Sequence, residues 1–255
     1  MEHGNLHIIE NAVNSATPIA VATTFVAGTK TGKFLILENQ TIPEKASISQ
    51  SLIEAATTFL KNGAPAGVVE THGIDGPVTL VVDILRPKQS LVVLGAGHVG
   101  QSVALIAAMM GYATIAVDDR EEFLSEERLP DPRVRRIRSE YGSILEKVPL
   151  SAASAVVIVT RGHQHDEACL KQVLRSDAAY VGMIGSKRRV LSIFKKLLAE
   201  GFKQSQLDRI HAPIGLPINA RSPQEIAISI LAEVIECLNS GGMKRSGATK
   251  PGPKG

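Results

Sequence analysis

The feature that most constrains the fold is the turn Gly-Ala-Gly-His-Val-Gly at residues 95–100, between a strand-like and a helix-like segment. The apolar run Leu91–Leu94 precedes it, and an alanine-rich segment follows it. In such a turn, Gly95 allows the tight bend, Gly97 lets the backbone approach a phosphate, and Gly100 lets the helix pack on the sheet. Free N–H groups at the helix N-terminus would bind that phosphate. The turn therefore predicts a nucleotide-like ligand, the alternative being a glycine-rich turn kept for packing alone.

The alternation of strand and helix continues to about residue 238. Aromatic residues make up 4% of a chain that is 44% apolar, so the core must be aliphatic, as in a buried parallel sheet. The strand-like runs are Leu91–Leu94, Thr114–Val117, Val134–Ile137, Ala155–Val159 and Ala179–Ile184, and the helical segments are His98–Met110, Tyr141–Lys147, Asp166–Arg175, Ser186–Glu200 and Pro223–Leu238. This pattern predicts an α/β domain over residues 87–239, with a Rossmann-like parallel sheet and helices on both faces.

Residues 1–86 lack the regular alternation of strand and helix, and their pattern predicts a small α+β domain. Expected strands are Pro18–Val26, Lys33–Glu38, Gly67–Glu70 and Val78–Leu85, and the expected helix is Ser47–Lys61. The polar segment 86–90 contains a proline, and we place the domain boundary at its start.

The net charge of +3 depends on the last sixteen residues. Residues 240–255 contain four basic residues and no acid, and they are rich in Gly, Ser and Pro, so we expect a disordered tail. Because the rest of the chain is close to neutral, no nucleic-acid partner is implied.

Cysteine usage and hydropathy favour a cytoplasmic protein. Cys169 and Cys237 lie in expected amphipathic helices without metal-ligand spacing, so we interpret both as buried small apolar residues. No basic segment followed by an apolar one begins the chain, and no apolar run reaches about 18 residues, so no membrane association is expected.

An acidic pair follows the second strand of the α/β region. Asp118, Asp119 and Arg120 come 18 to 20 residues after Gly100, where an acid usually accepts hydrogen bonds from ribose hydroxyls. Arg120 leaves open whether the ribose is phosphorylated. Within the turn, His98 and Val99 stand at the helix start, where His98 either contacts the ligand or is a solvent-facing cap residue.

A second glycine turn precedes the helix expected at 186–200. Lys187, Arg188 and Arg189 lie in its first turn, and cations there oppose the helix dipole at a cost of about 0.3–1 kcal/mol each. A bound anion would offset that cost, so Gly185, Ser186 and Lys187 are expected to bind one, with Ser186 also capping the helix. Arg189 is expected on a solvated basic face.

Two further segments carry histidines near the expected crevice. Thr160 and His163 follow the strand at 155–159, and His211 opens an apolar loop that extends to Ile218 and is expected to be buried or to cover the site. Asp166, close to His163, is most simply a helix-capping acid. These residues lack a recognised metal-ligand spacing, so we expect ligand contacts from Thr160, His163 and His211 and predict no metal site.

Taken together, these segments resemble the XdhC/CoxI family of xanthine dehydrogenase accessory factors. The matching stretches are LVVLGAGHVGQSVA, AVDDREEF, TRGHQHDEACL, AAYVGMIGSKRR and HAPIGLPINARSPQEIAISILAEVI, from about Leu91 to Ile235. The first 86 residues match less well: the family's Gly-Gly-Cys turn has no counterpart, because no cysteine precedes Cys169. Arg161-Gly162 also replaces a more usual Thr-His start.

The resemblance implies a homodimer that binds molybdenum cofactor (molybdopterin). It also implies support of cofactor sulfuration with a cysteine desulfurase, and cofactor insertion into a molybdenum hydroxylase apoenzyme. A non-catalytic maturation factor is thus our first hypothesis. The alternatives are an NAD(P)-dependent oxidoreductase using one of the histidines as acid or base, and a nucleotide-sensing regulator. Against the oxidoreductase, no Tyr-x-x-x-Lys pair occurs.

Overall fold

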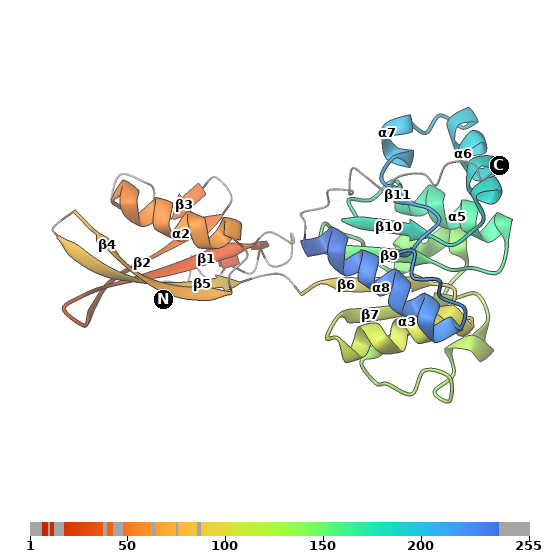
Figure 1. The fold of residues 1–255 in the computed structure, drawn as a ribbon, viewed down its shortest axis with the longest axis horizontal. Coiled ribbons are helices and arrows are strands. Elements are labelled where there is room, and N and C mark those ends of the chain that lie inside the picture. The colour runs from red at the N-terminus through yellow and green to blue at the C-terminus, as the bar shows by residue number, and fades with distance from the viewer. Residues whose placement is uncertain are drawn as a thin grey trace. The chain divides into compact units, whose positions relative to one another are not determined.

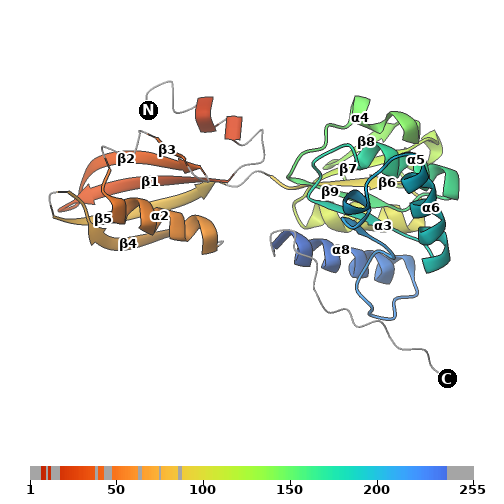
Figure 2. The same ribbon diagram turned by 90° about the horizontal axis from the view of Figure 1, so that it is seen from above.

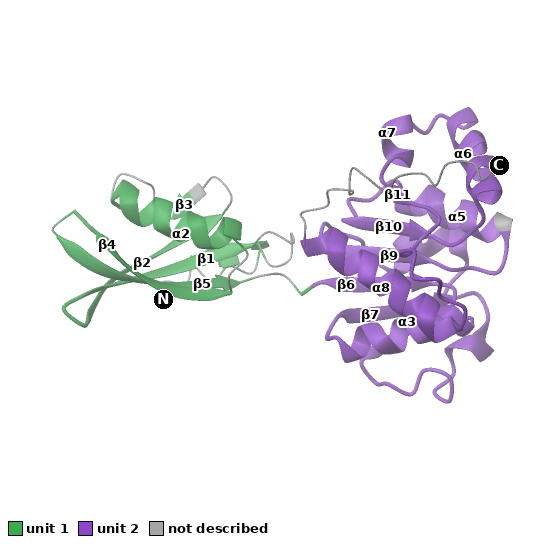
Figure 3. Cartoon of the chain, viewed as in Figure 1, with its two compact units in different colours: residues 1–88 green, residues 89–255 purple. Residues whose placement is uncertain are grey.

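The chain divides into two compact units, residues 1–88 and residues 89–255 (Figure 3). The computed structural model describes residues 7–9, 11–12, 18–37, 40–42, 48–62, 65–74, 76–85 and 88–239, without the side chains of Gln40 and His163. The tail expected at 240–255 lies outside the described residues, as do Glu38, Ser47 and residues 86–87.

The first unit is an antiparallel sheet with a helix on one face (Figure 1). Its elements are β1 (Ile19–Val26), β2 (Thr29–Leu37), β3 (Gln40–Ile42), α2 (Gln50–Asn62), β4 (Ala66–His72) and β5 (Pro77–Leu85), in the sheet order β3-β2-β1-β5-β4. Leu52, Ile53 and Ala56 of α2 pack on the apolar side chains of one sheet face.

β2 begins four residues before the strand expected from the sequence. Val26 pairs with Thr29, so only Ala27 and Gly28 form the hairpin turn. Both residues have positive φ, 48° and 79°, which matches the twist of a two-residue hairpin. The polar start of β2 has no apolar pattern of its own, and pairing with β1 extends it.

The second unit contains a six-stranded parallel sheet. Its elements are β6 (Ser90–Leu94), α3 (His98–Met109), β7 (Ala113–Asp118), η2 (Glu121–Leu124), β8 (Val134–Arg138), η3 (Tyr141–Ser143), α4 (Ile144–Lys147), β9 (Ser154–Ile158), α5 (His163–Val173), β10 (Tyr180–Met183), α6 (Lys187–Ala199), α7 (Gln204–Leu207), β11 (Ile210–His211) and α8 (Pro223–Asn239). The order β11-β10-β9-β6-β7-β8 is that of dinucleotide-binding domains, and it reverses direction between β6 and β9.

Helices cover both faces of this sheet, as expected (Figure 2). Leu91 and Val93 face α3 and α8, whereas Val92 and Leu94 face the side of α5 and α6. Because both faces are covered, the central strands β6 and β9 are almost continuously apolar, whereas the edge strand β8 has exposed arginines at positions 135 and 136. The Rossmann-like α/β prediction for this part of the chain is confirmed.

Some boundaries differ from the sequence-based expectations. Residues 141–147 form a 3₁₀ turn followed by a four-residue helix instead of one helix, and α5 begins at His163, three residues early. The segment beginning at His211 is not all loop, because Ile210–His211 pairs with β10 as the edge strand β11. Cys169 and Cys237 are both buried, as expected, and neither forms a disulfide. Among the described residues, no helix has the length and apolar character needed to span a bilayer.

Candidate functional site

The turn at 95–100 connects β6 to α3 at the carboxyl end of β6, beside the point where the strand order reverses. Gly95 has a φ of 105°, and a Cβ there would lie 2.7 Å from the carbonyl oxygen of Val159. A Cβ on Gly100 would overlap the carbonyl of Gly95. Gly95 and Gly100 are thus required by packing within the protein.

Gly97 differs from these two glycines, because a Cβ built on it meets nothing within 4 Å. It is the N-cap residue of α3, and no side chain caps this helix end. Open space lies next to the position where the first N–H groups of α3 need an acceptor. His98, the first residue of α3, is exposed, and Val99 is half-buried. A phosphate approaching Gly97 would find both backbone donors and room.

Asp118 faces inward from the end of β7. Its side chain is fully buried, Oδ2 accepts a hydrogen bond from the N–H of Ala96 at 2.8 Å, and Oδ1 accepts from Nε of Arg120 at 2.9 Å. Burial raises the pKa of Asp118, but the hydrogen bonds from Arg120 and Ala96 outweigh it and hold the pKa below its usual value. Asp118 thus holds the backbone of the glycine turn through its hydrogen bond to Ala96, and Arg120 is its ion-pair partner.

Asp119, the next residue, lies nearer the surface. Its Oδ2 is 2.8 Å from Nη2 of Arg161, which follows β9, and its side chain is 12% exposed. Its Oδ1 is buried without a hydrogen-bond partner. This Oδ1 lies 3.6 Å from Nε of Arg120, so Asp119 is near two arginines. Of the two acids that the sequence proposes for ribose binding, Asp119 is the one with an oxygen that accepts no hydrogen bond from the described residues.

The second glycine turn follows β10. Ser186 caps α6, with its Oγ accepting a hydrogen bond from the N–H of Arg189 at 3.3 Å, as the sequence predicts. Lys187 and Arg188 are exposed, and Gly185 is half-buried. Two strand spacings, about 10 Å, separate β10 from β6, so one extended ligand would be needed to touch both turns.

The prediction that Arg189 lies on a solvated basic face is wrong. The guanidinium of Arg189 forms an ion pair with the fully buried Asp166, which also accepts a hydrogen bond from Oγ1 of Thr160. The two contacts tie the end of β9 to α5 and α6, and the fixed hydroxyl of Thr160 belongs to this cluster. A buried carboxylate requires a cation as its partner. Because Asp166 and Arg189 lie on different helices, the residue pattern of one helix does not reveal their pairing.

His211 lies apart from the glycine turn. β11 is separated from β6 by two intervening strands, which corresponds to about 14 Å between them. Its ring stacks on Tyr180 at 4.6 Å between centroids, and Nδ1 lies 3.3 Å from Oε1 of Glu233 in α8. Glu233 also accepts hydrogen bonds from the hydroxyl of Tyr180 at 2.7 Å and from the N–H of Gly215 at 2.8 Å. This cluster anchors the apolar loop to α8.

Sequence reasoning missed Glu233 and Arg161. The partners of Glu233 come from β10, β11 and the apolar loop, so the sequence around Glu233 in α8 carries no local signal for them. Burial raises the pKa of Glu233, but the bonds from His211, Gly215 and Tyr180 together lower it. The side chain of His163 lies outside the described part of the chain. The described residues hold no group of three or more His, Cys, Asp or Glu arranged to bind a metal.

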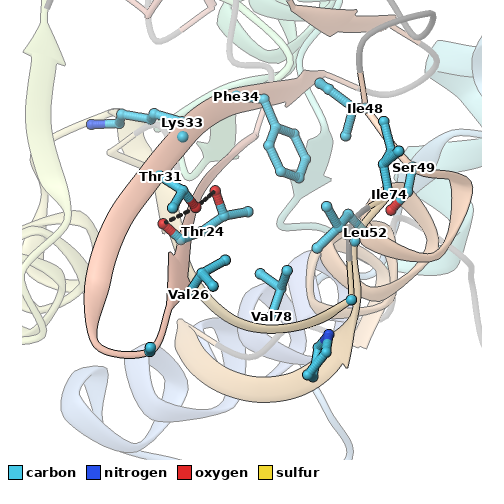
Figure 4. A pocket seen from close by; sticks show the side chains of 15 residues that line it. Thr24, Val26, Thr31, Lys33, Phe34, Ile48, Ser49, Leu52, Ile74 and Val78 are labelled. Atoms are coloured by element: carbon cyan, nitrogen blue, oxygen red, sulfur yellow. Dashed lines mark hydrogen bonds between the residues drawn. The ribbon is translucent and has the colours of Figure 1, made fainter.

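The first unit contains a cavity of about 750 Å³ that the sequence did not indicate (Figure 4). It lies between the β1–β2 hairpin, the start of α2 and the turn before β5, and apolar side chains such as Phe34, Leu52 and Val78 line it. Thr31 donates a hydrogen bond to Oγ1 of Thr24 at 3.2 Å within it. Its size suits a small apolar ligand.

The strand order and the glycine turn at the reversal point together define a domain of the Rossmann fold class. Comparison with known families then places the chain more narrowly. Residues 91–234 match the family described as the XdhC Rossmann domain, and the chain belongs to that family.

Two relatives and one solved structure are similar to this chain. YqeB of Escherichia coli (strain K12), named an uncharacterized protein, is 32% identical over 203 residues, 76% of this chain and 37% of YqeB. A protein of Bacillus subtilis (strain 168), named as a probable xanthine dehydrogenase subunit, is 29% identical over 164 residues, 64% of this chain and 47% of that protein. The chain thus spans less than half the length of both relatives.

The structural likeness extends over both units. The crystal structure of a protein described as a xanthine dehydrogenase from Bacillus halodurans matches with a TM-score of 0.66 and 22% identity, covering 93% of this chain and 67% of that one. This similarity concerns the fold.

Proposed function

We propose that this chain is a maturation factor for a molybdenum hydroxylase, and that it binds molybdenum cofactor, or a nucleotide form of it, at the turn around Gly97. The observation that carries the proposal is the open space at Gly97 beside the uncapped N-terminus of α3. Phosphate is the group that such a helix end favours, and molybdopterin carries one. Membership of the XdhC family and the name of the Bacillus subtilis relative support the choice of cargo.

In the proposed site, backbone groups and side chains would bind different parts of the cargo. Backbone N–H groups of His98, Val99 and Gly100 would hold the phosphate, and Asp119 would accept hydrogen bonds from a ribose if the cargo is a dinucleotide. The turn at Gly185–Lys187 would bind a second anionic part of an extended cargo, with the exposed Lys187 supplying charge.

The proposed partners follow from this role. They are the apoenzyme of a molybdenum hydroxylase, a second copy of this chain in a homodimer, and a cysteine desulfurase, all in the cytoplasm. Burial raises the pKa of the Cys169 thiol well above its usual value, and Cys237 is 4% exposed. Neither thiol suits sulfur relay, so in this proposal the desulfurase supplies sulfur to cofactor that the chain holds.

Equilibrium binding tests the proposal. The purified chain is titrated anaerobically with molybdenum cofactor released from a hydroxylase, and with NAD⁺ and NADP⁺. We expect cofactor binding that a Gly97→Val variant lowers at least about tenfold, because the added side chain fills the space that the phosphate needs. Gly142→Val is the matched control, since Gly142 also faces open space but lies outside the turn. Cofactor binding that both variants retain equally would place the cargo elsewhere.

An NAD(P)-dependent oxidoreductase is the second candidate. The dinucleotide-type strand order and Asp119 at the end of β7 favour it. Tight NAD(P) binding together with turnover of a substrate would replace the first proposal, whereas tight NAD(P) binding without turnover would favour a nucleotide-sensing regulator.

A further inference from the structure

The ion pair between Arg161 and Asp119 passes across the proposed phosphate site. Asp119 follows β7 and Arg161 follows β9, and these strands are the two neighbours of β6 in the sheet. Their side chains meet at 2.8 Å, so the pair bridges the carboxyl end of β6, where the turn at 95–100 begins. A ligand lying on Gly97 would meet this pair.

The pair is only partly satisfied by the protein. Arg161 has a side chain that is 48% exposed, and Oδ1 of Asp119 is buried without a hydrogen-bond partner, at an ion-pair distance of 3.6 Å from Nε of Arg120. The other acids of these two loops, Asp118 and Asp166, both have their oxygens engaged by internal donors. Asp119 is thus the acid that the architecture leaves incompletely bonded at this edge of the sheet.

Two helix ends flank the pair. Gly97 is the N-cap of α3 and Gly162, next to Arg161, is the N-cap of α5, and neither helix end has a side-chain cap. These helices start at neighbouring strands on the two sides of the reversal point. Donor groups from both helices and a guanidinium therefore lie at the same edge of the sheet, and an anion is the group that complements them.

We propose that Arg161 is a phosphate-binding residue that Asp119 holds in the unliganded protein, and that the ligand takes Arg161 from Asp119 when it binds. The inference rests on the proposed function, because it needs a phosphate-bearing ligand at Gly97. An exposed Arg–carboxylate pair is weak, and a phosphate offers the guanidinium a stronger bidentate partner. The exchange therefore favours the bound state, and Asp119 reduces phosphate affinity by no more than a few-fold.

Inorganic pyrophosphate is the probe, because it contains phosphate without ribose or pterin. Calorimetric titration of the full chain compares the wild type with Arg161→Gln, Asp119→Asn and the double variant. We expect Arg161→Gln to weaken pyrophosphate binding about tenfold, and Asp119→Asn to strengthen it about two- to fivefold, as removal of an exposed ion-pair competitor allows. In the Arg161→Gln background, Asp119→Asn should change nothing, because the competition acts through Arg161.

The control is Asp131→Asn. Asp131 and Arg133 form a similar ion pair at 2.6 Å in the loop before β8, so this variant removes the same charge from another Arg–Asp pair. We expect its pyrophosphate affinity to equal that of the wild type. If it gains as much as Asp119→Asn, or if Asp119→Asn gains equally without Arg161, the effect is one of net charge and the exchange does not occur.

The outcomes separate this inference from the proposed function. If pyrophosphate binding is lost in Gly97→Val but unchanged in Arg161→Gln, the site stands and the inference fails. If the wild type binds molybdenum cofactor but not pyrophosphate, the inference fails as well. If it binds neither, the proposed function itself is overturned.

Discussion

The hydrogen bonds of Asp118 to the glycine turn stabilise the second unit, and the variant Asp118→Asn tests this. The fully buried carboxylate accepts hydrogen bonds from Ala96 N–H and from N–H, Nε and Nη2 of Arg120. An asparagine keeps the shape, but its amide group would face the N–H of Ala96 as a second donor. An unsatisfied buried N–H costs about 1–3 kcal/mol, and the weakened bonds to Arg120 add roughly 1 kcal/mol. We expect a loss of about 2–4 kcal/mol.

Urea denaturation followed by tyrosine fluorescence measures this loss in the relevant unit. The chain has no tryptophan, and its three tyrosines, Tyr112, Tyr141 and Tyr180, all lie within residues 89–255. The signal therefore reports the unfolding of the second unit. Asp131→Asn again serves as the control and should change stability far less, because its ion-pair partner Arg133 is exposed.

The pH dependence gives the prediction a second test. The pKa of Asp118 lies below its usual value of 3.8 in the folded protein, so its contribution is complete above that value. As pH falls from about 5 through the folded-state pKa, the unfolded chain binds the proton first and stability declines. Asp118→Asn lacks this titration, so its deficit relative to the wild type should shrink toward low pH. A deficit below about 0.5 kcal/mol at neutral pH, or one that grows on acidification, would refute the reasoning.

Two further variants test the internal contacts of the site. Arg189→Ala should destabilise the second unit by about 2–4 kcal/mol, because it leaves the buried Asp166 without its cation, while the exposed neighbour variant Arg188→Ala should be nearly neutral in the same urea assay. Gly100→Ala should cost about 1–3 kcal/mol through overlap with the carbonyl of the turn, whereas Gly97→Ala should stay within about 0.5 kcal/mol of the wild type in thermal unfolding. Equal stability of the two members of either pair would contradict the assigned packing.

Much of the second unit follows from local sequence patterns. The apolar run at Leu91–Leu94 lies in a strand, because burial on both faces demands a continuous apolar stretch. The expected strand at Val134–Ile137 is also present, although Arg135 and Arg136 are exposed, because it pairs with β7 at the edge of the sheet. The Ser-Pro start before α8 and the Ser186 cap of α6 mark true helix ends, because capping depends on residues three positions apart. Where the pattern of apolar residues was weak, the predicted ends of the elements were wrong. The polar start of β2 is a strand only because β1 pairs with it.

The side-chain partners in the candidate site were not predictable in this way. Asp118 and Asp119 are adjacent in sequence, yet one is buried against Ala96 and the other reaches Arg161, 42 residues further along the chain. The pairs Arg189–Asp166 and His211–Glu233 likewise join different elements. The spacing of residues in the sequence indicates which residue types follow each strand, but it does not indicate which of their side chains are buried.

By itself, the sequence determined that a glycine turn joins a buried strand to a helix, and that strands and helices alternate after it, because turn, strand and helix preferences are local. Only the tertiary structure decided the strand order, the inward direction of Asp118 and the pairing of Asp119 with Arg161. These depend on which strands become neighbours, and long-range packing of the whole sheet makes that choice.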